Sequence, residues 1–528
     1  MIKKVISCFK NYSYLKKILI LLFISFIASI TFNAWLCDDA YISFRTINNF
    51  LNGFGLTWNT FERVQTYSNP LMVLLLSGIS FFTGELYYTT IFFSIIVSSV
   101  AVYILLFKIC KNEKIAIMIS IWLLLSRSFI FYSTSGLENC LTFLILAIFF
   151  HQFFKNETFN KWGLFKISLT GAFLLLNRMD SILLILPALF YIFFYKRNKD
   201  VSFASAFLIG LAGLIPFIMW GVFTFIYYGD LVPNTAHAKL AKGISKLVYI
   251  KKGLLYLFSV FLQDVFTIIP IILATIFIFI SKNKKAIIAS IGIFLSILYI
   301  IYVGGDFMLG RFLTPALFTA MILLAGLKID DSLFKKITPL FIVCTALFFA
   351  MTHFFVNNVY EQRNDFIKYY WGTYDDSAVY FSSTALFGRR TLDDEHTSTK
   401  KQWLEVHNTN PILIDSEGIG FIGYYAGPNI RIIDPFSLGD PLLSRLHMNL
   451  KWIDHIAHLK REIPEGYYET VATGQNLIES EPLAKYYEKT KIITQGKIFT
   501  KERFKTIINR MLGKYDYLII EYHNEVKK

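Results

Sequence analysis

Two adjacent carboxylates, Asp38 and Asp39, follow the first long apolar run of the chain, in the segment DDAYISFR (38–45). A carboxylate at the edge of a membrane could accept a proton from a sugar hydroxyl or bind a divalent cation. In a helix, Asp38 and Arg45 lie on one face, and Arg45 could hold a phosphate. The competing structural interpretation is a helix cap with a salt bridge, although two adjacent Asp residues suit a cap poorly.

Further polar motifs interrupt the apolar sequence, and each carries a carboxylate or a cation. They are ERVQTYSN (62–69), SGLEN (135–139), NRMD (177–180), YYGDLVPNTAHAKL (227–240) and GGDFMLGR (304–311). Cations at a membrane boundary can stabilise a departing phosphate. The candidate phosphate-binding residues are Arg45, Arg63, Arg178, His237, Lys239 and Arg311, and the candidate substrate-binding residues are Glu138, Asp180, Asn234 and Asp306.

Asp306 follows two glycines, and its sequence context leaves three roles open. It could orient an acceptor hydroxyl, pair with Arg311, or help to hold a metal ion. A divalent metal ion held by Asp38, Asp39 and Asp306 is therefore an open alternative, and no cofactor is certain from the sequence.

The composition indicates a multi-span membrane protein. Of 528 residues, 55% are hydrophobic and 17% charged, and the mean hydropathy is +0.50. These values exclude a disordered chain, a fibre and a conventional soluble enzyme. The net charge is +15, but the basic residues form short runs between apolar stretches, which indicates membrane orientation and not a nucleic-acid partner.

About eleven apolar runs are long enough to span a bilayer. They cover residues 18–36, 87–107, 115–131, 137–154, 163–177, 181–195, 201–228, 259–281, 286–303, 310–327 and 337–356. The run 70–82 is too short to span, and we expect it to lie at the surface or to be re-entrant. The Lys/Arg clusters then fall on one side, which predicts a cytoplasmic N-terminus and places the polar motifs outside the cell.

The chain divides into a transmembrane module, 1–356, and a polar C-terminal domain, 357–528, that we expect outside the cytoplasm. PILID (411–415), IRIID (430–434) and YDYLIIEY (515–522) predict strands, and EGIGFIGYYA between the first two predicts a helix, so we expect a small α/β domain. Residues 418–423 match the dinucleotide motif GxGxxG. We do not expect NAD, because Asp434 follows too closely for a crossover and the compartment does not supply NAD.

The motifs DDAYISFR, GFGLTWN (53–59), ERVQTYSNPL, SGLEN, NRMD, YYGDLVPNTAHAKL and GGDFMLGRF resemble the extracytoplasmic loops of membrane glycosyltransferases of the GT-C superfamily, and most of all its arabinofuranosyltransferase group. DSEGIGFIGYY and IIDPFSLGDPLLSR in the C-terminal region are also similar to that group. The resemblance covers most of the chain, in order. It implies a polyprenyl-phosphate-linked sugar as donor, for example a pentose such as arabinofuranose, and an Asp of the first outer loop as base. That Asp is Asp38 or Asp39, with Asp39 preferred.

The resulting hypothesis is an inverting glycosyltransferase of the cytoplasmic membrane, with its active site outside and a cell-envelope glycan or lipid as acceptor. A transporter or flippase of a lipid-linked glycan is the main alternative, because such proteins carry ionisable residues on broken helices. Here the charges cluster at the outer ends of the predicted spans and Asp264 is the main acid within a span, which weighs against transport. A polymerase or ligase that uses diphosphate-linked oligosaccharides, and a sugar-binding membrane protein without catalysis, are further alternatives.

Overall fold

The computed structural model describes residues 12–239, 244–327, 339, 373–387, 412–414, 419–448 and 459–526. The chain forms two compact units. Unit 1 consists of Met1–Leu36, Thr90–Pro216 and Tyr249–Gly388, and unit 2 of Cys37–Thr89, Phe217–Val248 and Arg389–Lys528. Each unit therefore combines three separate stretches of sequence, whereas the predicted division into 1–356 and 357–528 follows the chain.

Unit 1 is built from helices that overlap the predicted apolar runs, except for the helix Asp376–Thr384, which lies in the predicted C-terminal domain. They are α2 (Tyr14–Phe32), α5 (Tyr87–Tyr103), η1 (Ile104–Ile109), α6 (Glu113–Leu125), α7 (Arg127–Tyr132), α8 (Asn139–Lys155), α9 (Lys161–Asn177), η2 (Met179–Leu184), α10 (Leu186–Tyr191), η3 (Ile192–Lys196), α11 (Phe203–Gly213), α14 (Lys246–Gln263), α15 (Val265–Ile280), α16 (Lys284–Val303), η4 (Arg311–Leu313), α17 (Thr314–Ala325) and α20 (Asp376–Thr384). The helices α5 and α14 each begin a few residues before the stretch of unit 1 that contains the rest of the helix.

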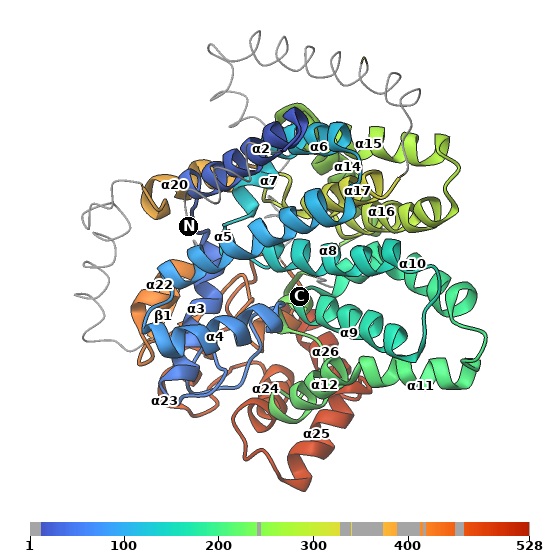
Figure 1. The fold of residues 1–528 in the computed structure, drawn as a ribbon. Coiled ribbons are helices and arrows are strands. Elements are labelled where there is room, and N and C mark those ends of the chain that lie inside the picture. Colours follow the sequence, from blue (N-terminus) through green and yellow to red (C-terminus); the bar gives the residue numbers. More distant parts are fainter. Residues whose placement is uncertain are drawn as a thin grey trace. The chain divides into compact units, whose positions relative to one another are not determined.

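The core of unit 1 surrounds α17. Every residue of this helix is buried, and it packs against α8, α15 and α16. A helix that is apolar on all sides belongs in the middle of a bundle, since it has no polar face to turn to water. The helices α8 and α9 lie side by side in this bundle (Figure 1).

Three described helices are long and apolar enough to cross a bilayer: α2, the continuous pair α5–η1, and α16. Two bent pairs raise that number to five if each counts as one span: α11 with α12 (Ile215–Tyr227), bent by 53°, and α14 with α15, bent by 104°. Several other predicted spans form shorter apolar helices, such as α8 and η4–α17. The described helices thus indicate a helical, membrane-associated protein.

The predicted span 259–281 is not one straight helix, because it breaks at Asp264 between α14 and α15. The buried carboxylate of Asp264 accepts hydrogen bonds from the backbone N–H of Ser128 and from the hydroxyl of Thr267, both at 2.7 Å. A short acidic side chain that bonds nearby backbone groups favours an interrupted helix.

Unit 2 contains most of the remaining elements. They are α3 (Asp38–Leu51), α4 (Pro70–Thr83), most of α12, α13 (Asn234–Lys239), β1 (Ile412–Ile414), α22 (Ile419–Ala426), β2 (Arg431–Ile433), η5 (Leu443–Arg445), α23 (Tyr467–Thr473), α24 (Glu481–Thr494), α25 (Lys501–Met511) and α26 (Asp516–Val526). The apolar helix α4 has 14 residues between Pro70 and the left-handed Gly84. It is about 20 Å long, which agrees with the predicted short run at 70–82.

The C-terminal region contains one short parallel pair of strands, β1 and β2, in the part that the structure describes. They match the predicted strands PILID and IRIID, and the predicted helix between them is α22. The third predicted strand, YDYLIIEY, was wrong, because these residues form most of α26. Tyr515, Leu518, Ile519 and Tyr522 all pack on one core, and their spacing of three and four residues is that of a helix face.

Some predicted features lie outside the described residues. These are the span 337–356, apart from residue 339, and Gly418, the first glycine of the GxGxxG match. The other two glycines of that motif lie in α22.

Candidate functional site

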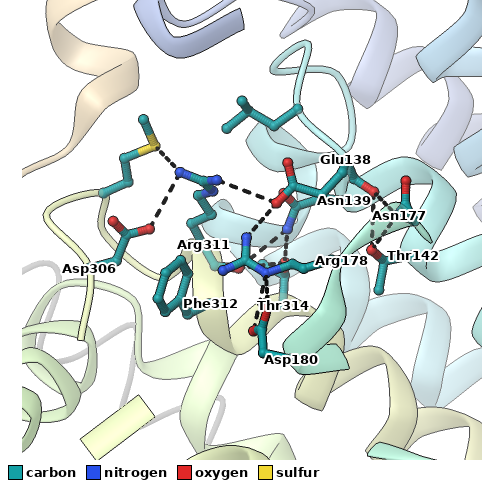
Figure 2. A network of polar contacts seen from close by, with 12 residues as sticks. Glu138, Asn139, Thr142, Asn177, Arg178, Asp180, Asp306, Arg311, Phe312 and Thr314 are labelled. Atoms are coloured by element: carbon teal, nitrogen blue, oxygen red, sulfur yellow. Dashed lines mark hydrogen bonds and ion pairs between the residues drawn. The ribbon is translucent and has the colours of Figure 1, made fainter. Parts of the chain in front are cut away.

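Three of the predicted polar motifs meet inside unit 1. Figure 2 shows the residues that meet. Glu138 precedes α8, Arg178 lies between α9 and η2, and Asp180 lies in η2. Asp306 and Arg311 come before α17. The two arginines lie 40 and 173 residues from Glu138 in the sequence. The fold therefore joins candidates that the sequence could place only on separate loops.

Glu138 connects the two arginines. Its Oε1 pairs with Nη1 of Arg178 and lies 3.3 Å from Nη2 of Arg311. Nε of Arg178 donates to both carboxylate oxygens of Asp180, at 2.9 and 3.1 Å, and Nη1 of Arg311 lies 3.6 Å from Oδ2 of Asp306. Glu138, Asp306 and Arg311 are 2%, 8% and 7% exposed, whereas the side chains of Arg178 and Asp180 are 16% and 25% exposed, so water reaches the network at its Arg178–Asp180 end.

Two asparagine side chains hold the helices that carry the network. Asn177 donates to the backbone carbonyl of Glu138 at 2.9 Å, and Asn139 donates to the backbone carbonyl of Arg311 and to the hydroxyl of Thr314, at 3.3 and 3.0 Å. These bonds join the start of α8 to the end of α9 and to the start of α17, as Figure 2 shows. The side chains of the network are thereby fixed on rigid elements and not on free loops.

The approach to Asp306 requires glycine. Gly305 has a φ of +79°, in the left-handed region. A Cβ added there would lie 2.5 Å from Cβ of Tyr256. Both the backbone conformation and the close contact therefore exclude a larger residue, and the turn brings Asp306 next to Arg311.

The network holds two guanidinium groups and three carboxylates in a mostly buried place. Burying such charges costs free energy that their attraction only partly offsets, so an ion network of this kind is weak evidence for stability alone. The guanidinium of Arg178 also lies over the ring of Phe312, 4.3 Å from its centroid. Chemically, a rigid pair of arginines could bind an oxyanion by exchanging carboxylate partners for it.

In unit 2, Asp38 caps a helix. Its two carboxylate oxygens accept the backbone N–H groups of Gly420, at 3.1 Å, and Phe421, at 2.7 Å, in the first turn of α22. A Cβ on Gly420 would lie 2.0 Å from the carbonyl oxygen of Asp38. Close packing thus explains this glycine of the GxGxxG match. Asp39 is the next residue in the first turn of α3 and is partly buried.

Arg45 is buried and bonds to backbone carbonyls, unlike the phosphate-binding role predicted for it. It donates to the carbonyls of Trp58 at 2.6 Å, of Ile430 at 2.8 Å, and of Gly423. Its guanidinium lies 4.9 Å from the ring centroid of Trp58. Burial lowers the pKa of Arg45 to about 9. These contacts join α3 to α22 and β2, so its role is structural.

Asp230 is the centre of a second charged cluster, in unit 2. Its Oδ2 lies 2.8 Å from Arg445 Nη2, 3.4 Å from Arg510 Nη2 and 3.1 Å from His237 Nε2. Arg445 donates to Nδ1 of His237 at 3.0 Å. Because arginine cannot accept a hydrogen bond, Nδ1 is the acceptor, so Nε2 carries the proton that His237 donates to Asp230.

The charge state of Asp230 follows from these partners. Burial alone would raise its pKa, but the hydrogen bond from His237 and the charges of Arg445 and Arg510 hold the pKa of Asp230 well below its usual range. The carboxylate of Asp230 is therefore ionised.

The other candidates of unit 2 lie near this cluster. Arg63 donates to the carbonyls of Tyr227, Ile493 and Gly496. Asn234 donates to three carbonyls of the loop 437–440 and accepts from the hydroxyl of Ser444. Arg63 therefore joins the loop between α3 and α4 to the C-terminal region, and Asn234 joins α13 to the same region. Lys239 ends α13 and is partly buried.

No metal centre is formed by the described residues, among which no group of three or more His, Cys, Asp or Glu side chains could hold an ion. The individual candidates also have other partners. Asp38 accepts two backbone N–H groups, and Asp306 faces Arg311. Donors that point at a carboxylate do not suit a cation, so these two residues do not fit the predicted metal role in this conformation.

No family model and no curated protein matches this chain.

Several charged residues of unit 2 were missed in the sequence, although all except Arg510 lie in motifs quoted for the resemblance. Asp230 is part of YYGDLVPN, and Arg445 is part of IIDPFSLGDPLLSR. Glu62, the first residue of ERVQTYSN, is another missed residue. It is a buried acid in unit 2. Arg510 had no such signal, since it is one of many basic residues near the C-terminus.

Proposed function

We propose that this protein is a membrane glycosyltransferase that moves a sugar from a polyprenyl-phosphate donor to a cell-envelope glycan or lipid. The observation that carries the proposal is the network of Figure 2, in which SGLEN, NRMD and GGDFMLGR meet through Glu138, Arg178 and Arg311. The motifs were selected because they resemble loops of such enzymes, and their convergence on a buried pair of arginines supports that choice.

The proposed reaction is a single displacement with inversion. The acceptor hydroxyl oxygen forms a bond to the anomeric carbon, while the bond between that carbon and the phosphate oxygen breaks and its electron pair stays on the phosphate. The proton of the hydroxyl passes to a carboxylate, and Asp39 is proposed for that role from the sequence resemblance alone. Arg178 and Arg311 are proposed to stabilise the charge of the departing phosphate, because charge-assisted bonds to an oxyanion strengthen as its charge grows. The proposal includes about eleven spans, with the active site on the outer side of the cytoplasmic membrane.

The test follows release of free polyprenyl phosphate from a panel of polyprenyl-phosphate sugars, with purified protein in lipid and a cell-envelope extract as acceptor. Asp39→Asn and Arg311→Gln should abolish release. Arg197→Gln is the matched control, since Arg197 donates to the carbonyls of Val201 and Phe193 and lies outside the network. Release that persists in Asp39→Asn would exclude the assigned base, and loss of release with EDTA would reinstate a metal ion.

A transporter of a lipid-linked glycan is the second candidate, because α14 and α15 form a helix pair bent by 104° around the buried Asp264. Broken helices with an ionisable residue are typical of transporters. However, Asp264 accepts hydrogen bonds from Ser128 and Thr267, and these bonds account for a buried carboxylate without a transport role. Proteoliposomes distinguish the two functions: a transporter moves a labelled lipid-linked sugar across the bilayer without breaking its phosphate bond.

A further inference from the structure

A small cavity in unit 2 has more cations than acids in its lining. Its volume is about 20 Å³, and it opens on one side to solvent. The described lining residues include three arginines, Arg63, Arg445 and Arg510, and one acid, Asp230. A space of this size admits one or two waters, or the oxygen atoms of an anionic group that enters from the open side.

The charge of this cavity is not balanced by its lining. Oδ2 of Asp230 already forms ion pairs with Arg445 and Arg510 and contacts His237. Its Oδ1 accepts a hydrogen bond from the backbone N–H of Val232 at 3.1 Å. Three guanidinium groups and one carboxylate leave an excess of two positive charges. Such an excess in a place of restricted solvent access attracts a doubly charged anion.

The arginines are also held in position before any ligand arrives. Arg63 is anchored by the carbonyls of Tyr227 and Ile493, and Arg510 by the carbonyl of Gly229 at 2.8 Å. Nε of Arg445 is buried and has no hydrogen-bond partner in the part of the chain that the structure describes. A buried donor without a partner is costly, and Arg445 keeps this position through its bonds to Asp230 and His237.

We propose that this cavity binds a phosphate group, through Arg445, Arg510 and Arg63. The excess of two charges matches a phosphate monoester, and the planar guanidinium groups suit its oxygen atoms. The phosphate could belong to a lipid carrier or to a soluble phosphate-bearing ligand, since both present the same chemistry. The inference does not rest on the proposed transferase, because it concerns binding within unit 2 alone.

The test measures binding of inorganic phosphate to the full-length protein in detergent by calorimetry. Arg445→Gln and Arg510→Gln should each weaken binding about tenfold, because each removes a charge-assisted hydrogen bond. Asp230→Asn should instead tighten binding about tenfold, since it removes the negative charge of the cavity. This opposite sign is the outcome that a purely structural ion cluster does not produce. Lys505→Gln, an exposed cation of α25 outside the lining, is the control.

A second arm uses vesicles of zwitterionic lipid that contain a long-chain alkyl phosphate. Vesicle binding with the same dependence on Arg445 and Asp230 supports the site and assigns the phosphate to a lipid; binding of inorganic phosphate alone supports it and assigns a soluble ligand. The proposal is overturned if folded wild-type protein binds neither probe, or if the Arg445, Arg510 and Asp230 variants bind phosphate as the wild type does. Phosphate binding is measured without sugar transfer, so its failure is distinct from failure of the proposed function.

Discussion

Glu62 makes the stability of unit 2 depend on pH. This side chain is 7% exposed, and it accepts a hydrogen bond from Asn59 at 3.1 Å. Burial, together with the charge of Asp440, raises the pKa of Glu62 from 4.5 to about 8. The folded protein therefore holds a proton on Glu62 at neutral pH, while the unfolded chain has released it.

The direction of the pH dependence follows from this difference. Below pH 4.5 the carboxyl is protonated in both states, and the folded state has its full stability. As the pH rises toward 8, ionisation of Glu62 stabilises the unfolded chain but not the folded chain. The free energy of unfolding therefore falls. Between pH 6 and pH 8 the loss is about 2 kcal/mol, which corresponds to a lowering of the melting temperature by about 5 °C for a unit of this size.

Glu62→Gln should remove this part of the pH dependence. The neutral amide has the same shape, and its oxygen still accepts the bond from Asn59. Thermal unfolding in detergent, followed by tryptophan fluorescence from pH 5.5 to 8.5, should show wild type losing about 5 °C more than the variant between pH 6 and 8. Asp440 is present in both proteins, so its titration largely cancels in the comparison. Glu469→Gln, at an exposed carboxylate of α23, should behave as wild type. Parallel curves for wild type and Glu62→Gln would refute the argument.

Two further predictions depend on the contacts of individual residues, and a third depends on the distribution of Lys and Arg along the chain. Asp38→Ala should destabilise the protein by about 1 to 2 kcal/mol in thermal unfolding, because the first turn of α22 loses its cap; an unchanged melting temperature would contradict the capping role. Arg311→Leu should cost about 3 kcal/mol or more, since Glu138 and Asp306 lose a buried partner; Arg311→Lys should recover only part of this loss, and full recovery would argue against the paired geometry. A reporter fused after residue 200 should be detected in the cytoplasm, and its appearance outside the cell would overturn the predicted topology.

Local patterns in the sequence predicted helices well and contacts poorly. The apolar runs identified α5, α8, α9 and α16 to within a few residues, because helix formation depends on neighbours along the chain. The prediction of a strand at YDYLIIEY was wrong because residue types and residue spacing pointed to different structures. Its aromatic and β-branched residues favour a strand, but the spacing of those that reach the core is helical.

The candidate residues were easier to find than their partners. Glu138, Arg178 and Arg311 could be selected because each is a charged residue at the end of an apolar run. The sequence could not predict that they contact one another, since any cation on the same side was an equally good partner. Arg45 illustrates the same limit: spacing on α3 suggested Asp38 as a neighbour, whereas its partners are carbonyls as many as 385 residues away.

The adjacent pair Asp38 and Asp39 shows how a distant contact can separate two residues that the sequence treats alike. Successive residues of a helix point about 100° apart, so two neighbours in the first turn of α3 cannot serve the same group. Asp38 points to the N-terminus of α22, where both of its oxygens accept backbone N–H groups. Those bonds make Asp38 the cap of α22, and Asp39 is the residue that we propose as the base. Asp38→Asn should alter the melting temperature and Asp39→Asn the rate of transfer, and the reverse pattern would exchange the two roles.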